Sequence, residues 1–155
     1  VTGSDGHTVS MTSGNTFRFR PDGSRIELVT HGQVNPFGMV TDLYETRFSA
    51  DCHSKPISQL LSGGCYPSFG RPDLGLGFVA STMEHLHGST AIAGLEISQD
   101  NSFPASFQNQ FYSGNVMTCR INRNQMVRKG DTIQAVERPD FLTSDDPWFR
   151  PVDLM

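Results

Sequence analysis

One stretch in the middle of the chain concentrates side chains that can bind metals or transfer protons. It holds three of the five histidines, His53, His85 and His87, together with Asp51 and Cys52. Imidazole and carboxylate groups are ligands for zinc, iron, nickel or copper, and a thiolate adds a softer ligand. The residue types therefore predict a divalent metal site, with zinc or calcium as the ion, although the spacing matches no established zinc signature. The expected ligands are Asp51, His53, His85 and His87.

His85 and His87 are separated by one residue, so an extended backbone places both rings on the same face, and a loop can also bring them together. Three interpretations of the histidines stay open at this point. They bind a metal, or they hold loops together through backbone carbonyl groups, with Ser89 capping His87. In the third interpretation His53, His85 and His87 act as catalytic residues, with imidazole as a base and no metal.

The three cysteines, Cys52, Cys65 and Cys119, are an odd number and cannot all pair within one chain. No CxxC or CxxCH sequence occurs, which excludes zinc-ribbon, thioredoxin-like and covalent haem motifs. Cys52 and Cys119 are predicted to be small buried residues, Cys119 within a strand. Cys65 lies in a glycine-rich loop and is predicted to be exposed or to form a disulfide.

Acidic residues near the C-terminus offer a second, weaker metal pattern at Asp140, Asp145 and Asp146. They lack the spacing of a calcium-binding loop, and we expect Asp145 to cap a short turn before a proline instead. Several arginines are expected on outward strand faces, paired with carboxylates on neighbouring strands. These are Arg18, Arg20, Arg120 and Arg123.

The composition of the 155 residues favours short strands over helices. The chain has 15 glycines, 9 prolines and 11 phenylalanines, spread along its length. Its net charge of -4 gives no electrostatic reason to bind nucleic acid. It also lacks an apolar run long enough for a transmembrane helix, so we expect no membrane insertion.

Alternation of apolar and polar residues predicts the individual strands. Residues 16–29 read as a hairpin closed by Pro21-Asp22-Gly23, whose proline and glycine suit a tight turn. Further strands are predicted at 39–41, 47–50, 57–61 and within 89–97, and two or three more in 110–136. In that last region turns are expected at Ser113-Gly114 and at Asn122 to Asn124.

The predicted fold class is all-β, made of short antiparallel strands and hairpins. Residues 1–15 are expected to be a flexible entry segment, and residues 16–155 a single β-rich domain. The recurring hairpins suggest a partial β-propeller, for which the length supplies about three blades. Because an open ring exposes strand edges, we expect the chain to complete itself as a homo-oligomer.

The phrases "DCHSKP", "HGSTAIAG" and "SDDPWFRPVD" carry a family resemblance. With the sequence around them they resemble an internal part of a bacterial family of membrane-bound dehydrogenases. Proteins of that family are much longer and contain a β-propeller of the soluble glucose/sorbosone dehydrogenase type. The resemblance implies a propeller fold, a sugar or polyol as a small-molecule substrate, and a periplasmic or extracellular location.

The resemblance also implies where a quinone cofactor would bind. Dehydrogenases of this fold hold pyrroloquinoline quinone with an Arg-Asn-Pro motif, and the matching residues here are Val34-Asn35-Pro36. Asn35 is therefore the cofactor-binding residue that the resemblance carries over. Val34 has no donor and no charge to pair with a quinone carboxylate, so we do not expect pyrroloquinoline quinone to bind.

Three functions from different classes remain after this reading. The first is a sugar or polyol dehydrogenase, as the resemblance implies. The second is a metal-dependent hydrolase of the lactonase, phosphotriesterase or esterase kind, in which an ion polarises the ester and activates water. The third is a non-enzymatic β-rich fragment that assembles with itself. The fold cannot choose among them.

Overall fold

The computed structural model describes residues 1–12, 14–88 and 91–155. These residues form β-strands and one short 3-10 helix, η1 (Ala105–Phe107), and contain no α-helix, which confirms the all-β prediction. No helix among them is long and apolar enough to cross a bilayer. The strands are β1 (Thr16–Arg18), β2 (Glu27–Thr30), β3 (Pro36–Thr41), β4 (Arg47–Asp51), β5 (Ile57–Leu60), β6 (Ile92–Ser98), β7 (Gln110–Asn115), β8 (Arg120–Lys129) and β9 (Thr132–Thr143).

The chain divides into two compact units. The first consists of residues 1–35 and 60–80, and the second of residues 36–59 and 81–155. In the first unit β1 and β2 pair antiparallel, which confirms the predicted hairpin. Gly23 closes its turn with a φ of +81°, a conformation that glycine adopts without steric cost. The division of the chain into an entry segment and one domain stays a prediction.

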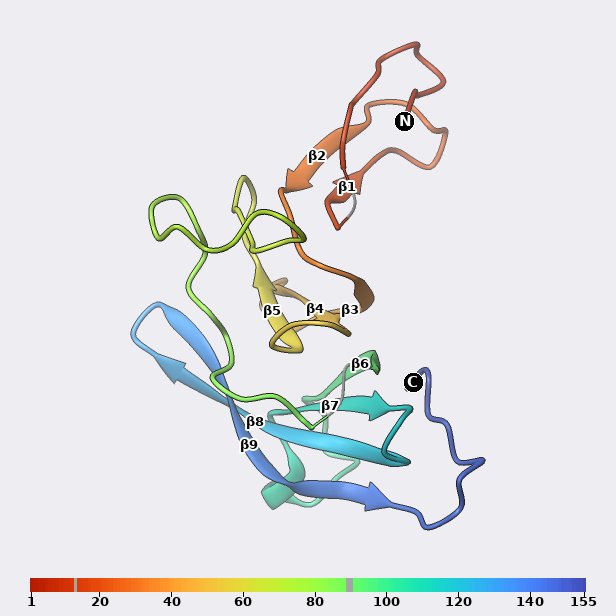
Figure 1. The fold of residues 1–155 in the computed structure, drawn as a ribbon, viewed down its shortest axis with the longest axis vertical. Coiled ribbons are helices and arrows are strands. Elements are labelled where there is room, and N and C mark those ends of the chain that lie inside the picture. Colours follow the sequence, from red (N-terminus) through yellow and green to blue (C-terminus); the bar gives the residue numbers. More distant parts are fainter. Residues whose placement is uncertain (13, 89–90) are drawn as a thin grey trace. The chain divides into compact units, whose positions relative to one another are not determined.

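The second unit contains two antiparallel sheets (Figure 1). Strands β3, β4 and β5 form one, and β6, β7, β8 and β9 form the other as a four-stranded meander. Their buried apolar side chains make one core, in which Phe48 of β4 meets Phe111 of β7 edge to face at 4.8 Å between ring centroids. Burial of these two rings, both inaccessible to solvent, ties the two sheets together.

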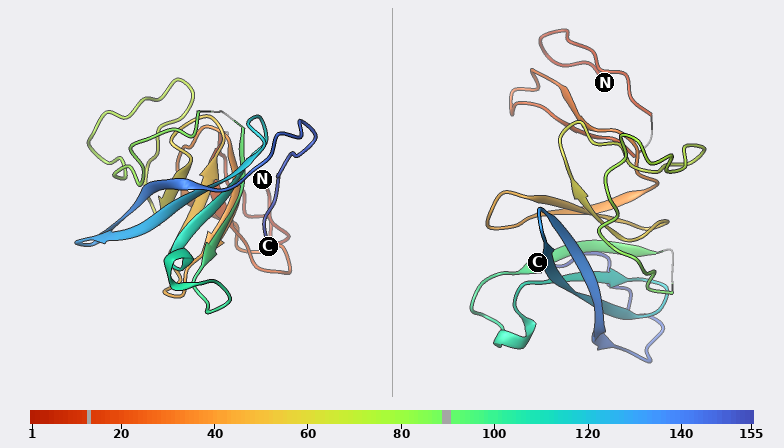
Figure 2. Two further views of the ribbon diagram at one scale, coloured as in Figure 1. Left: turned by 90° about the horizontal axis from the view of Figure 1, so that it is seen from below. Right: turned by 90° about the vertical axis from the view of Figure 1, so that its left-hand side faces the viewer.

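Strands β8 and β9 are longer than β6 and β7, so their hairpin extends beyond the rest of the sheet (Figure 2). The turns predicted at Ser113-Gly114 and at Asn122 to Asn124 are wrong, because both lie inside strands. The chain reverses instead at residues 116–119, where Cys119 has a φ of +54°. Cys119 is therefore a turn residue and not, as predicted, part of a strand.

The four-stranded meander has the number of strands of one propeller blade. The sheets of the described residues are open, and they fix neither a number of blades nor an assembly. The partial propeller and its completion by self-association therefore stay predictions.

Candidate functional site

Residues 83–87 carry the histidine pair in a segment whose burial alternates. Met83 and His87 are buried and His85 is half-buried, whereas Glu84 and Leu86 between them are exposed. This period of two is the pattern of an extended chain lying against a surface. The prediction that His85 and His87 share a face is therefore confirmed: their rings lie 4.9 Å apart, edge to face.

The start of this segment is anchored to strands on both sides. The carbonyl oxygen of Thr82 accepts a hydrogen bond from the backbone of Ala135 in β9 at 2.8 Å. The Thr82 hydroxyl accepts one from the backbone of Gln59 at 2.9 Å, and the Met83 sulfur accepts one from Ile57. Backbone and side-chain contacts thus hold the histidine segment in place without any secondary structure of its own.

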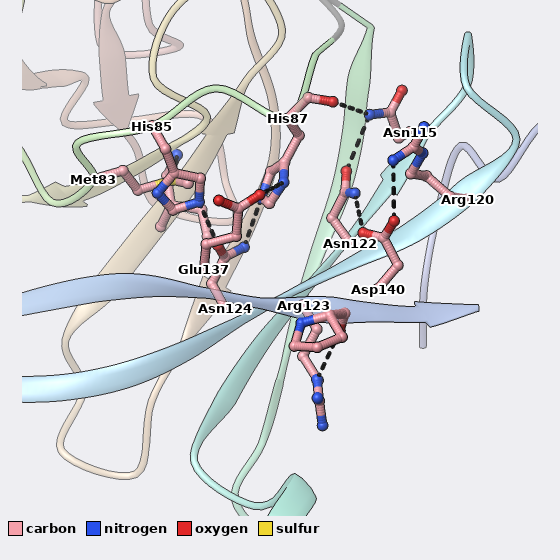
Figure 3. A network of polar contacts seen from close by, with 12 residues as sticks. Met83, His85, His87, Asn115, Arg120, Asn122, Arg123, Asn124, Glu137 and Asp140 are labelled. Carbon is pink, nitrogen blue, oxygen red and sulfur yellow. Dashed lines mark hydrogen bonds and ion pairs between the residues drawn. The ribbon is translucent and has the colours of Figure 1, made fainter. Parts of the chain in front are cut away.

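Asn124 of β8 lies between the two imidazoles (Figure 3). Its Oδ1 is 2.9 Å from His85 Nε2, and its Nδ2 is 3.0 Å from His87 Nε2. The Asn124 side chain is fully buried, and His87 is only 6% exposed. One amide therefore connects both rings and fixes their orientation.

Glu137 of β9 completes the cluster because it lies opposite Asn124 in the register of β8 and β9. Its Oε1 is 3.7 Å from His87 Nδ1, and its side chain is 58% exposed, so it faces solvent on one side. Ligand atoms of His85, His87 and Glu137 all lie within 4.8 Å of one another. This group could hold a metal ion.

The environment of His87 disfavours its charged form. Burial, and next the neighbouring His85, lower the pKa of His87 from its ordinary value of 6.5, while Glu137 and Asp140 oppose the shift. Below the pKa that His87 has in the unfolded chain, His87 takes up a proton in the unfolded chain but stays neutral in the folded one. The contribution of His87 to the free energy of unfolding is therefore fully present above about pH 6.5 and is lost as the pH falls towards its lower folded pKa.

This linkage predicts an acid sensitivity that resides in one side chain. In metal-free protein the contribution of His87 should fall by up to about 1.4 kcal/mol per pH unit below pH 6.5. Urea unfolding at several pH values measures it. His87→Gln should lose this part of the pH dependence, and His7→Gln, an exposed residue of the first unit, should keep it. An unchanged slope in His87→Gln would contradict the prediction.

A second set of polar side chains continues from the histidines along the same face of the sheet (Figure 3). Asn115 donates through Nδ2 to the carbonyl oxygen of His87 at 3.2 Å and to Asn122 Oδ1 at 3.1 Å. Asn122 donates to Asp140 at 2.7 Å, and Asp140 also pairs with Arg120 at 3.1 Å. We call Asn115, Asn122, Asp140 and Arg120 the polar ladder.

A cleft of about 560 Å³ opens beside the cluster and the ladder. Its lining includes His87 and Glu137 of the cluster and Arg120 and Asp140 of the ladder. A smaller cleft of about 260 Å³ is lined by His85 and again by Glu137. Glu137 therefore stands between two solvent-accessible spaces, each of which reaches one of the histidines.

The other two predicted metal ligands do not join this cluster. Asp51 is buried at the end of β4, where its Oδ1 accepts the backbone N–H of His53 at 3.0 Å. Among the described residues, no group of three or more potential ligands includes Asp51 or His53. The prediction that His53 gathers with His85 and His87 is therefore corrected: Asp51 shapes the turn in which His53 is exposed.

The predicted cofactor residue Asn35 is exposed and belongs to the first unit, whereas the histidine cluster belongs to the second. Val34 is half-buried and offers a quinone no charged partner. The residues present thus do not fit pyrroloquinoline quinone. Ser89, predicted as the cap of His87, lies outside the described residues.

The weaker acidic pattern does not form a calcium site in the structure. Asp140 is engaged by Asn122 and Arg120, away from a loop. The turn after β9 is closed by Asp146, which accepts the backbone N–H of Trp148 at 2.9 Å, and not by Asp145 as predicted. An aspartate readily accepts the N–H two residues further on, which favours the position of Asp146.

The arginines and cysteines follow the predictions only in part. Arg18 pairs with Glu27 across the first hairpin as expected. Arg123 instead donates to a backbone carbonyl and lies 4.6 Å from the Phe107 ring centroid.

All three cysteines are half-buried, so Cys52 and Cys119 are less buried than predicted, and Cys65 is a thiol.

Sequence reasoning missed Asn124 and Glu137, together with the Asn115 and Asn122 of the polar ladder. One signal was present in "RINRN", where two asparagines alternate with a long apolar and a charged residue. Alternate residues of a strand share a face, so this pattern places Asn122 and Asn124 together. Because asparagine is depleted in strands, a buried pair of them marks a polar site.

The fold and the site define the class of protein: an all-β domain in which a histidine pair on an extended segment meets a buried asparagine and a carboxylate of the four-stranded sheet. The sequence profile of the family described as "Domain of unknown function (DUF7133)" matches residues 2–155, and the chain belongs to this family. No curated protein and no solved structure matches the chain.

Proposed function

We propose that this domain is a metal-dependent hydrolase that holds one divalent ion between His85, His87 and Glu137. The observation that supports this is the convergence of their ligand atoms to within 4.8 Å of one another. Two imidazoles and a carboxylate are a ligand set of catalytic zinc sites, which keep a further position open for water. Calcium takes oxygen ligands, so the two nitrogen donors favour zinc over calcium.

The cleft gives the proposed ion access to a small-molecule substrate. A bound ion of this kind polarises an ester or phosphoester and lowers the pKa of water. Arg120 lines the same cleft, paired with Asp140, and can donate to the place where such a substrate would develop negative charge. Esters, lactones and phosphotriesters are therefore the substrate classes to test.

Zinc titration of metal-free protein tests the proposal. We expect one ion per chain, and we expect Glu137→Gln to weaken zinc affinity by more than about 100-fold. Loss of a ligand should exceed the 10–100-fold effect typical of outer-sphere partners. Competition with a chromophoric chelator measures the affinity, and hydrolysis of the three substrate classes measures activity.

Glu27→Gln is the matched control, because Glu27 pairs with Arg18 in the first unit. It should leave zinc affinity unchanged. Absence of bound zinc in the wild type, or equal affinities of the Glu137 and Glu27 variants, would refute the proposal.

A non-enzymatic role is the second candidate, and one observation favours it. Asn124 bonds one nitrogen of each imidazole, as in a purely structural polar core. A chain that folds, self-associates and binds no zinc would support this candidate. The sugar or polyol dehydrogenase that the resemblance implies stays a prediction, and a dye-linked sugar oxidation assay with added quinone separates it from hydrolysis.

A further inference from the structure

The amide of Asn124 meets the two histidines with its two chemically different ends. The oxygen, which can only accept, lies 2.9 Å from His85 Nε2, and the nitrogen, which can only donate, lies 3.0 Å from His87 Nε2. The side chain is fully buried, so no solvent competes for these bonds. The hydrogen-bonding roles of both rings follow from this contact (Figure 3).

His85 must carry its proton on Nε2, because it donates to the Asn124 oxygen. Its Nδ1 then holds a lone pair. His87 must keep a lone pair on Nε2 to accept from the Asn124 nitrogen, so in the neutral ring its proton is on Nδ1. That Nδ1 is the atom nearest Glu137, at 3.7 Å. The two neutral rings are therefore opposite tautomers.

A neutral imidazole binds a metal through one nitrogen while the other keeps its proton. His85 meets this condition through Nδ1 with its bond to Asn124 intact. His87 does not, because with Nε2 accepting from Asn124 a metal at Nδ1 would leave the ring without a proton. Turning the amide by 180° exchanges the roles of the two histidines. Even then only one of them can bind a metal while it keeps its hydrogen bond to Asn124.

We infer that Asn124 is a positioning residue that holds His85 and His87 in opposite tautomers and so prepares only one imidazole at a time as a metal ligand. The inference rests on the proposed metal site. A metal that recruits both rings has to displace one of the two Asn124 hydrogen bonds. The Asn124 amide therefore lowers the metal affinity of the site below the affinity that the three ligands alone would give.

Asn124→Asp separates this role from simple packing, because a carboxylate has the same shape and accepts at both oxygens. Both rings can then donate from Nε2 and keep a lone pair on Nδ1 for a metal, as histidines do in carboxylate–histidine–zinc sites. We expect zinc to bind Asn124→Asp about tenfold more tightly than the wild type. Asn124→Leu, which removes both contacts, should bind it about tenfold more weakly.

Gln125→Glu is the control for charge. It makes the same amide-to-carboxylate change one residue along β8, where Gln125 contacts Arg138 and no histidine. A gain in zinc affinity equal to that of Asn124→Asp would reduce the effect to electrostatics and overturn the inference. So would an Asn124→Asp variant that binds zinc no more tightly than the wild type.

Histidine-ring NMR on metal-free protein at about pH 8 provides the readout that needs no metal. We expect one Nε2–H and one Nδ1–H ring in the wild type, and two Nε2–H rings in Asn124→Asp. Two identical tautomers in the wild type would refute the inference. Opposite tautomers in a chain that binds no zinc would refute the hydrolase and leave the role of Asn124 in place.

Discussion

Replacing Phe111 with alanine is expected to lower the free energy of unfolding by about 3–5 kcal/mol. Phe111 is inaccessible to solvent and packs edge to face against Phe48 of the other sheet of the second unit. Its removal costs the transfer free energy of the ring and leaves a cavity. Strands β4 and β7 cannot move together to close this cavity, because each is held by hydrogen bonds within its own sheet. Urea unfolding with a two-state fit measures the change.

Phe37→Ala is the matched control, because Phe37 of β3 is 56% exposed. Its effect should stay within about 0.5 kcal/mol. Phe111 also lies directly opposite Asn124 in the register of β7 and β8. A shift of β7 would therefore move Asn124 and alter its contacts with the two histidines. A loss for Phe111→Ala as small as that for Phe37→Ala would show that this ring does not hold the sheets together.

The strands could be predicted wherever side chains alternate between apolar and polar. The hairpin of residues 16–29 and the strands that follow Pro36 and Arg47 are examples. The same rule failed at Asn122 to Asn124, because there the inward-facing residues are themselves polar. Two asparagines and two arginines within five residues resemble a turn by composition. Inside the strand, however, the polar ladder satisfies Asn122 and the two histidines satisfy Asn124.

The site could be predicted only where neighbouring residues in the sequence form it. His85 and His87 meet because an extended segment puts alternate residues on one face. Asn124 and Glu137 reach them through the pairing of β8 with β9, which no local pattern specifies. The prediction that His53 lies with His85 and His87 failed for the same reason. The closeness of His53 to Asp51 and Cys52 in the sequence says nothing about its distance from the other two histidines.

Replacing Asn122 with leucine is expected to lower the free energy of unfolding by about 2–4 kcal/mol. The leucine has a similar volume, but it leaves the buried Asn115 amide without its Asn122 acceptor and removes a donor from Asp140. Desolvated polar groups that lose their partners cost more than the net value of the bond itself. Gln125→Leu, on a half-buried position of the same strand, should cost less than about 1 kcal/mol. Urea unfolding compares the two.

The double variant Asn115→Leu/Asn122→Leu tests what the polar ladder is for. Removing both partners leaves fewer orphaned groups than the two single changes added together, because neither asparagine then remains to miss the other. The two single losses should therefore not add, with a coupling of about 0.5–3 kcal/mol. Asn115 also bonds the backbone oxygen of His87, and that contact is lost with it. Zinc affinity should therefore stay about tenfold below the wild type even where stability recovers. Recovery of both would mean that the ladder serves the fold alone, whereas recovery of stability without affinity assigns it to the histidine site.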